Sequence, residues 1–225
     1  MVVPVKLLAA AKSRLAHPER AALALAMAQD TVAAAREIDA DVVVAVVVVT
    51  SDRTARAGMV GMADTSDTAR GAAGNAASQR STDARVVVIP DLPGTGLNAA
   101  LTHGAAEAAR RWPDAGVAAM SADLAALRPA ELRAALLAAP ARGRAMVADA
   151  DGTGTVMLAA APGTPLAPRF GPASRAAHIS SGARDLTGSL GRSVPGLRRD
   201  VDTLADLREA MSLGVGPRTH DILKP

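Results

Sequence analysis

Short runs of apolar residues recur along the chain, separated by longer segments in which polar residues are frequent. The longest run, residues 42–49, is rich in valine and is apolar at both odd and even positions. A strand with this pattern is buried on both faces, which is typical of a central strand in a covered, largely parallel sheet. The runs predicted to form strands are residues 2–5, 42–50, 86–89, 116–120, 145–148, 155–160 and 194–198.

Segments with apolar residues near helical spacing lie between these runs. In residues 19–37, Leu23 and Met27 recur on one face, and Pro18 stands where the first turn of a helix favours proline. Strands that alternate with helices predict one doubly wound, Rossmann-like α/β domain with a mostly parallel central sheet. The strands around residues 149–155 are expected to add a small antiparallel part. The other predicted helices are residues 97–111, 129–139, 174–181 and a segment from about 203 to 213.

One segment departs from this alternation. Residues 53–85 lose hydrophobic periodicity and fill with Ala, Gly, Ser and Thr, and residues 71–81 within them are typical of a mobile loop or linker. Because strands continue after it, we interpret the segment as a flexible insertion at about residues 61–83 inside one domain. The domain is predicted to span residues 1–218, and residues 219–225 are predicted to form a C-terminal tail.

Composition excludes several kinds of function. Apolar residues make up 49% of the 225 residues, enough for a sizeable core, but the aromatic residues are only Trp112 and Phe170. A nucleic-acid surface that stacks bases needs aromatic side chains, and a formal charge of +3 is a small excess, so no nucleic-acid partner is expected. The absence of cysteine excludes disulfides, thiolate metal sites and cysteine nucleophiles.

The sequence has no membrane or export signal. The longest apolar run, residues 42–49, is far too short to span a bilayer, and the first residues lack the pattern of a signal peptide. We therefore expect a soluble cytoplasmic protein without a membrane partner.

Common nucleotide and catalytic signatures are also missing. The sequence has neither G-x-x-x-x-G-K-[ST] nor a G-x-G-x-x-G after the first predicted strand, which excludes a P-loop NTPase and a dinucleotide fingerprint. It has no G-x-S-x-G, and its four histidines lack metal-ligand spacing.

Acidic residues follow two of the predicted strands. Asp123 comes after the run 116–120, and Asp200 and Asp202 come after the run 194–198. Because the carboxyl ends of parallel strands meet at one edge of a sheet, these carboxylates are expected to converge where α/β folds bind ligands. Mg²⁺ shared between carboxylates and a triphosphate would suit such a site. The alternative is that Asp200 and Asp202 only cap the last helix and that Asp123 starts a turn.

Three cations follow the first predicted strand. Lys6, Lys12 and Arg14 lie in the loop that leads to the first helix. Such a loop could hold a polyphosphate, and it could equally carry solvated charges that serve only solubility.

Six segments occur in order from residue 2 to about residue 218, and together they are specific where each alone is weak. They are Pro4-Val5-Lys6 with Ala11-Lys12-Ser13-Arg14-Leu15, Pro90-Asp91 with Gly96-Leu97-Asn98-Ala99-Ala100-Leu101, Ala122-Asp123-Leu124, Asp151-Gly152-Thr153-Gly154-Thr155, Arg169-Phe170-Gly171-Pro172-Ala173-Ser174, and Pro195-Gly196-Leu197 with Asp200-Val201-Asp202-Thr203. These segments resemble the 2-phospho-L-lactate guanylyltransferase family. Its actinobacterial members are phosphoenolpyruvate guanylyltransferases of coenzyme F-420 biosynthesis, and the resemblance is greatest to these.

The resemblance implies a nucleotide-diphospho-sugar transferase (GT-A-like) fold and an enzyme in which an acceptor phosphate attacks the α-phosphorus of GTP, with pyrophosphate leaving. The acceptor would be phosphoenolpyruvate or 2-phospho-L-lactate, and the likeness of residues 152–203 to the actinobacterial members favours phosphoenolpyruvate. The product would pass to a downstream transferase of the pathway. Because the attacking phosphate is already ionised, no strong general base is needed, and catalysis would rest on positioning and charge neutralisation.

The resemblance also implies roles for particular residues. Lys6, Lys12 and Arg14 would hold the triphosphate, and Gly96, Leu97 and Asn98 would contact guanine. The residues implied to bind Mg²⁺ are Asp123, Asp200 and, less directly, Asp202. The residues implied to bind the acceptor are Thr155, Gly171 and Ser174. The residues implied to be catalytic are Asp123, Asp200, Lys12 and Arg14.

Two other interpretations remain at this point. The chain could guanylylate another acceptor, such as a molybdopterin or a sugar phosphate. It could also be a non-catalytic nucleotide-binding module of the same fold. The presence of Asp123, Asp200 and Asp202 weighs against the second, because such a module has no need of these acids.

Overall fold

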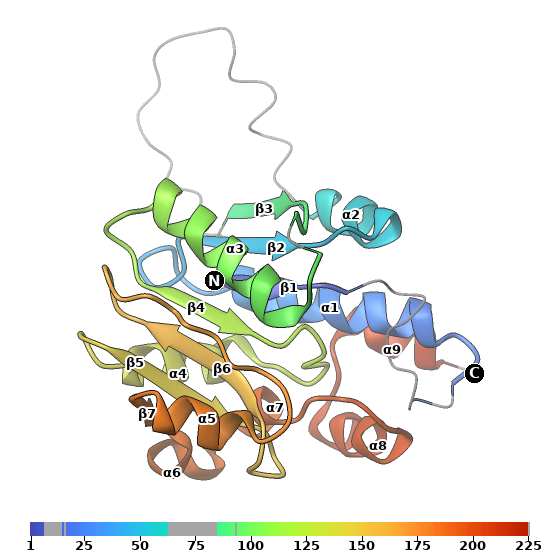
Figure 1. Cartoon of the computed structure of the whole chain (residues 1–225). Coiled ribbons are helices and arrows are strands. Elements are labelled where there is room, and N and C mark those ends of the chain that lie inside the picture. Colours follow the sequence, from blue (N-terminus) through green and yellow to red (C-terminus); the bar gives the residue numbers. More distant parts are fainter. Residues whose placement is uncertain (7–14, 16, 63–84, 93, 225) are drawn as a thin grey trace, which may run out of the picture.

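The computed structural model describes residues 1–6, 15, 17–62, 85–92 and 94–224. In these residues seven strands form one sheet, in the order β3-β2-β1-β4-β6-β5-β7 (Figure 1). The strand β6 runs antiparallel to its neighbours β4 and β5, and the other paired strands are parallel. This confirms the predicted α/β fold with a mostly parallel sheet and a small antiparallel part. The strands are β1 (Val2–Pro4), β2 (Ala45–Val49), β3 (Arg85–Ile89), β4 (Val117–Met120), β5 (Arg144–Ala148), β6 (Thr155–Ala160) and β7 (Ala183–Asp185).

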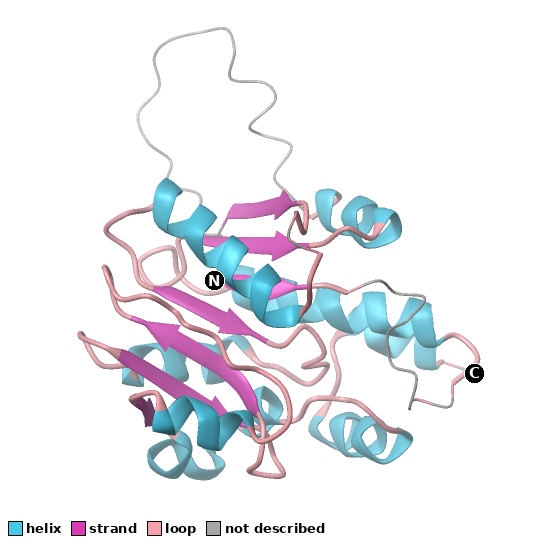
Figure 2. Ribbon diagram, in the orientation of Figure 1, coloured by secondary structure: helices cyan, strands magenta, loops and turns pink. Residues whose placement is uncertain are grey.

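Helices cover both faces of this sheet (Figure 2). A 3₁₀ turn at Gly191–Ser193 joins two of them. The α-helices of the described residues are α1 (Arg20–Arg36), α2 (Arg53–Val60), α3 (Leu97–Arg111), α4 (Pro129–Ala138), α5 (Ser174–Ser180), α6 (Thr187–Leu190), α7 (Pro195–Arg198), α8 (Leu204–Leu213) and α9 (Pro217–Leu223).

The helix α3 packs closely on one face of the sheet because it has a glycine at the point of contact. A Cβ atom at Gly104 would lie 2.6 Å from Val2 Cγ1 and 2.7 Å from Val49 Cγ2. Since valine side chains in a packed core have few rotamers to move into, any larger residue would push α3 away from β1 and β2. This approach fixes where the first turn of α3 stands relative to the strand ends.

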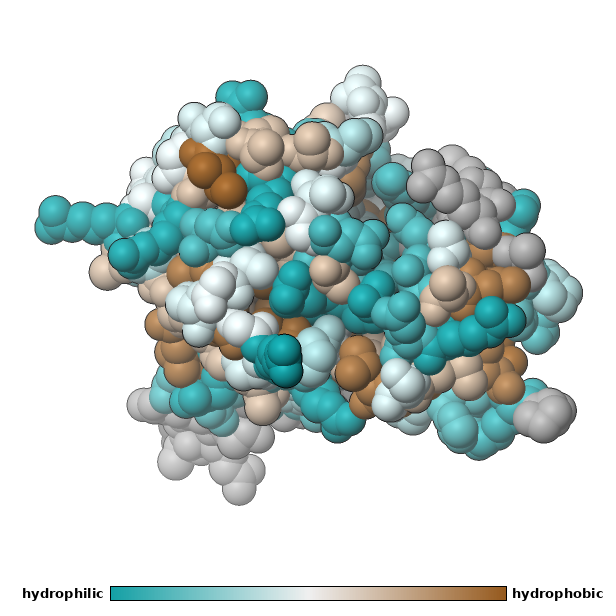
Figure 3. All heavy atoms as spheres, turned by 90° about the horizontal axis from the view of Figure 1, so that it is seen from below, coloured by the Kyte–Doolittle hydropathy of each residue, from teal (hydrophilic) through white to brown (hydrophobic). Residues whose placement is uncertain are grey.

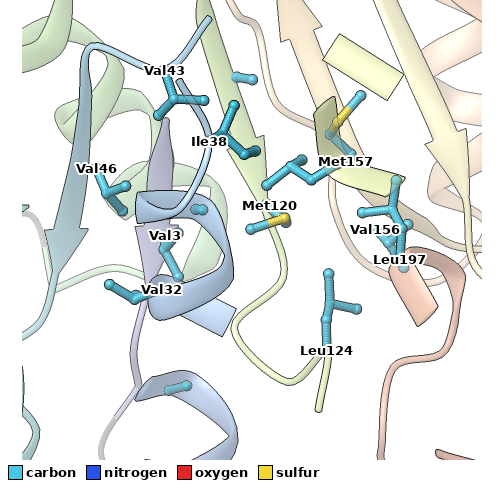
Figure 4. Packing of buried hydrophobic residues seen from close by; sticks show 14 of the residues in the cluster. Val3, Val32, Ile38, Val43, Val46, Met120, Leu124, Val156, Met157 and Leu197 are labelled. Carbon is cyan, nitrogen blue, oxygen red and sulfur yellow. The ribbon is translucent and has the colours of Figure 1, made fainter. Parts of the chain in front are cut away.

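The helix α1 covers the opposite face. Val32 of α1 and Ile38, just beyond it, lie in the same buried cluster as Val3, Val46 and Met120 of three neighbouring strands (Figure 4). Full burial of an aliphatic side chain contributes about 1.5–3 kcal/mol. The valine, leucine and methionine side chains of this cluster therefore replace the aromatic residues that the chain lacks.

Besides the clusters that the sheet forms with α1 and with α3, a third apolar cluster, which includes Leu23, Met27, Val201 and Leu207, lies where α8 and α9 meet α1. The buried carboxylate of Asp30 on α1 accepts hydrogen bonds from the backbone N–H groups of Thr219 (2.8 Å) and Arg218 (3.2 Å) in the first turn of α9. Residues 219–223, predicted to be part of a tail, are therefore the continuation of a helix that is packed against the domain.

Several element predictions need correction. The predicted strand 194–198 is instead the short helix α7 (Pro195–Arg198), because the buried carboxylate of Glu131 on α4 binds its N–H groups, as described below. The segment after residue 52 begins with the helix α2, whose first turn is capped by Asp52 accepting the Ala55 N–H at 2.9 Å. Pro18 lies in a turn before α1 and not in the first turn of the helix.

Most of the predicted insertion, residues 63–83, lies outside the described residues, as do residues 71–81.

The outer surface mixes polar and apolar side chains. In the view from below, apolar residues lie in small groups among polar ones (Figure 3). Among the described helices, none has both the length and the apolar character that crossing a membrane requires.

Candidate active site

The carboxyl edge of the sheet gathers most of the predicted site residues. Lys6 follows β1 and Asp123 follows β4 at this edge, which lies on the right of the sheet in Figure 1. Because β6 runs antiparallel, its first residue, Thr155, lies at the same edge, paired with the last residue of β5, Ala148. The reversed direction of β6 therefore brings its first residue beside the carboxyl ends of the parallel strands.

The turn that carries Asp123 is held by α1. The buried side chain of Thr31 donates its hydroxyl to the carbonyl of Ala122 (3.3 Å) and accepts the N–H of Leu124 (3.2 Å). The carbonyl of Asp123 also accepts the N–H of Val201 at 3.2 Å. This last bond places Asp123 directly beside the segment that carries Asp200.

Asp200 reaches the edge from α7, not from a strand. The buried carboxylate of Glu131 on α4 accepts the N–H of Leu197 at 2.7 Å, and the N–H of Gly196 also binds it. Gly196 packs against the carbonyl of Ala126, where a Cβ atom would collide. These contacts anchor α7, and therefore the residues that follow it, against α4.

The acidic residues around Asp200 change its proton affinity. Burial raises the pKa of Asp200 to about 7, and the neighbouring carboxylates of Asp123, Asp149 and Asp202 add to the rise in that order. A carboxyl group that holds its proton near neutral pH beside other carboxylates is in a site suited to a cation.

Asp149 is a site residue that the sequence analysis did not predict. Its carboxylate accepts the N–H groups of Thr153 (3.0 Å) and Gly154 (2.7 Å) and so closes the turn before β6. A Cβ atom at Gly154 would collide with this carboxylate. Arg198 of α7 secures the turn from the other side by donating to the carbonyls of Ala148 (3.1 Å) and Asp149 (2.7 Å). The feature of the sequence that could have indicated Asp149 is an aspartate directly before a glycine-rich turn.

The predicted metal ligands are carboxylates, as a magnesium site requires, but the three of them do not form one close group. Carboxylate oxygens are the donors that Mg²⁺ prefers. Among the described residues, however, no group of three or more His, Asp or Glu side chains lies close enough to hold a metal ion. Asp202 is exposed, and its N–H donates to Asp206 at 3.2 Å. Asp123 and Asp200 are the pair that fits a cation shared with phosphate oxygens, because Mg²⁺ keeps most of its ligands as water or substrate.

The predicted acceptor residues lie together around the start of β6 and α5. Ser174 is buried in the first turn of α5. Its Oγ lies close to Gly154, the residue before Thr155, because a Cβ atom built on Gly154 would be 3.8 Å from it. The Thr155 Oγ1 lies 2.9 Å from Nδ1 of His178, also on α5. Gly171 has a φ of +135°, which L side chains rarely adopt.

The predicted guanine-binding segment is tied to the acceptor side. Gly96 precedes α3 with a φ of +120°, and a Cβ atom there would meet nothing within 4 Å. The Asn98 side chain donates from Nδ2 to the Phe170 carbonyl (2.9 Å) and accepts the Phe170 N–H at Oδ1 (2.8 Å). Leu97 packs against the core on the α3 face. The amide of Asn98 therefore holds the loop that precedes Gly171.

The basic loop is described only at its beginning. Lys6 is exposed at the end of β1. Lys12 and Arg14 lie outside the described residues, so their predicted role stays a prediction.

A cavity of about 480 Å³ lies at the opposite edge of the sheet. It is lined by residues at the starts of β2 and β4 and at the ends of α3 and α4, among them Ala45, Val117 and Trp112. Of the predicted site residues that the structure describes, none lines it.

Comparison with known proteins decides the family. No protein-family model matches the chain. The phosphoenolpyruvate guanylyltransferase of Frankia casuarinae is 55% identical over 223 residues, which cover 99% of this chain and 76% of that protein. The enzyme of the same name from Thermomonospora curvata is 50% identical over 97% of this chain and 86% of its own. The chain belongs to the phosphoenolpyruvate guanylyltransferase family. The resemblance found in the sequence motifs is thereby confirmed, and the chain is a nucleotidyltransferase.

The fold of this guanylyltransferase family member also occurs in a distant solved structure. A nucleotidyl transferase from Methanothermobacter thermautotroptrophicus superposes with a TM-score of 0.54 at 17% identity, covering 95% of this chain and 97% of that one. The two chains therefore share the same α/β fold.

Proposed function

We propose that this protein transfers the guanylyl group of GTP to the phosphate of phosphoenolpyruvate and releases pyrophosphate. The observation that supports this most is the pairing of Asp123 and Asp200 beside the acceptor-side residues Thr155 and Ser174, at one edge of the sheet, in a chain about half identical to enzymes of that name. An acidic pair suits a metal–triphosphate, and the neighbouring hydroxyl groups of Thr155 and Ser174 suit a small anion.

The reaction needs few protein groups that move protons. An oxygen of the acceptor phosphate forms a bond to the α-phosphorus of GTP, and the bond from that phosphorus to the bridging oxygen breaks, with its electron pair leaving on pyrophosphate. Because the attacking oxygen is already ionised, no side chain has to remove a proton. This accords with the carboxylates and hydroxyls found among the described residues of the site.

The residues of this chain would therefore act by holding and orienting. Asp123 and Asp200 would hold Mg²⁺, with Asp202 at a greater distance, and the Mg²⁺ when bound would neutralise charge on the triphosphate. Lys6, Lys12 and Arg14 would hold the triphosphate. Residues 96–98 would contact guanine, mainly through backbone groups, since the Asn98 side chain is bound to Phe170.

The product would be a phosphoanhydride that joins GMP to a three-carbon acid. Such an activated group is a substrate for a transferase that displaces GMP, and we place this step in coenzyme F-420 biosynthesis. The preference for phosphoenolpyruvate over 2-phospho-L-lactate is part of the proposal.

The proposal is tested by supplying GTP and Mg²⁺ with one acceptor at a time and measuring pyrophosphate and product mass. We expect release with phosphoenolpyruvate, less with 2-phospho-L-lactate, and none without an acceptor. Absence of release with both acids at micromolar enzyme would rule the proposal out.

The metal assignment has its own test. Replacing Asp123 by Ala should lower turnover by about 10²–10³-fold, because the cation that screens the phosphates would lose a ligand. Asp221→Ala is the matched control, since Asp221 is exposed on α9 and forms its ion pair with Lys224. Circular dichroism should be unchanged in both variants. Full turnover in Asp123→Ala would remove the assignment.

A further inference from the structure

His178 forms hydrogen bonds at both ring nitrogens and is completely buried. Its Nε2 lies 2.8 Å from the backbone nitrogen of Arg169, and its Nδ1 lies 2.9 Å from the Thr155 hydroxyl. The ring also meets Phe170 edge to face, with centroids 5.2 Å apart and an interplanar angle of 74°. A side chain held on three sides in this way has a single orientation.

The partners determine which nitrogen carries the proton. A backbone N–H can only donate, so Nε2 must be the acceptor. The ring is neutral, because burial and then the charges of Arg144 and Arg169 lower the pKa of His178 to about 4. A neutral ring that accepts at Nε2 carries its proton at Nδ1. His178 therefore donates to Thr155 Oγ1.

This direction has a consequence for Thr155. A hydroxyl has one proton to donate and can accept at its lone pairs. Since His178 occupies an acceptor position of Thr155, the hydroxyl proton stays available for another oxygen. An anionic oxygen accepts such a bond more strongly than a neutral one.

We propose that His178 is a positioning residue that makes the Thr155 hydroxyl a donor to an anionic oxygen of the acceptor acid. The inference rests on the proposed function, which places the acceptor at Thr155. The same imidazole fixes the Arg169 end of the loop before Gly171, and Asn98 fixes that loop at Phe170. One histidine thus sets both the direction of a hydroxyl and the position of the neighbouring loop.

The first test needs no substrate. Nitrogen chemical shifts of ¹⁵N-histidine-labelled protein identify the protonated ring nitrogen. We expect the proton of His178 at Nδ1 near neutral pH, and a proton at Nε2 would overturn the inference even if the enzyme is active. This result is independent of whether phosphoenolpyruvate is the acceptor.

The second test is a double-mutant cycle with Thr155→Val and His178→Phe. Loss of a hydrogen bond to a charged group costs about 1.5–3 kcal/mol, so Thr155→Val should raise the KM for phosphoenolpyruvate by roughly 10–100-fold and change the KM for GTP less than about twofold. Since His178 acts on the acceptor partly through Thr155, the double variant should be impaired less than the product of the two single effects. Multiplied effects of the two substitutions would overturn the inference.

Two further variants keep the test interpretable if His178→Phe folds poorly. Thr155→Ser retains the hydroxyl and should keep the KM for phosphoenolpyruvate within a few-fold of the parent. Thr164→Val is the matched control, because Thr164 lies in a turn after β6, at the opposite edge of the sheet, and its substitution should leave both KM values unchanged. A Thr155→Ser variant as impaired as Thr155→Val would contradict the donor role.

Discussion

At the scale of single residues, the site is built from acids whose neighbours hold them in place. Asp123 stands in a turn bound by Thr31, and Asp149 closes a turn that only glycine at 154 leaves room for. The carboxyl group of Asp200 is half-buried and close enough to both for their charges to raise its pKa. Holding like charges together in this way stabilises a bound cation and destabilises the metal-free fold.

A prediction follows for Asp200. Its pKa is about 7 in the folded protein, against the ordinary value of 3.8 for an aspartate, so the folded state holds this proton more tightly than the unfolded state. The resulting stability is fully present below pH 3.8 and is lost as the pH rises through 7. Asp200→Asn should therefore stabilise the metal-free protein at pH 8 by roughly 1–3 kcal/mol, less than the full shift because the site is coupled and partly solvated.

Urea unfolding in EDTA at pH 8 and pH 5 measures this effect. The difference between Asp200→Asn and the parent should be largest at pH 8 and should shrink at pH 5. A difference that does not change with pH would show that Asp200 does not titrate near neutrality.

At the scale of elements, the sequence identifies the regular parts better than the irregular ones. The valine runs predict β2 and β3, and the helical spacing predicts α1, α3 and α4, because each has a strong local pattern. The helix α7 lacks such a pattern. Its residues are apolar and few, and its conformation depends on Glu131, which is far away in the sequence.

The same reason explains what was missed in the site. Asp123 and Asp200 could be found because they follow apolar segments and match family motifs. Asp149 and His178 depend on contacts with Gly154, Thr155 and Arg169 that no local spacing encodes. The family resemblance indicates which residues are candidates for the site, and the structure shows which of these residues are in contact.

Glu131 gives a prediction at this scale. Glu131→Ala would leave the N–H groups of Gly196 and Leu197 buried without their acceptor, which should destabilise the protein by about 2–4 kcal/mol and lower kcat by misplacing Asp200. Glu131→Gln keeps an acceptor oxygen and should retain most of both properties. Equal stability and turnover of Glu131→Ala and the parent would refute the anchoring role of Glu131.

At the scale of the whole molecule, the last helix of the described residues packs against the first. The helix α9 packs on α1 through the third apolar cluster and through Asp30, which caps its first turn. The terminal helix is therefore part of the domain's cooperative unit.

Replacing Asp30 by Ala should lower the free energy of unfolding by about 1–3 kcal/mol, because two N–H groups lose a buried charged acceptor. Turnover at a temperature well below the midpoint should be unchanged. Asp39→Ala is the matched control, since Asp39 forms an exposed ion pair with Arg133 at 3.6 Å that is worth little. If both variants unfold at the same urea concentration, the cap contributes nothing.

The reversed strand β6 has an evolutionary consequence. The hairpin β5–β6, the helix α5 and the strand β7 form one uninterrupted stretch, from Arg144 to Asp185, that contains Thr155, Gly171, Ser174 and His178. The residues proposed to hold the triphosphate and guanine all come earlier in the chain. Two recombination points would then suffice to exchange this segment, which carries the residues proposed to bind the acceptor, while those proposed to hold the triphosphate and guanine stay in place.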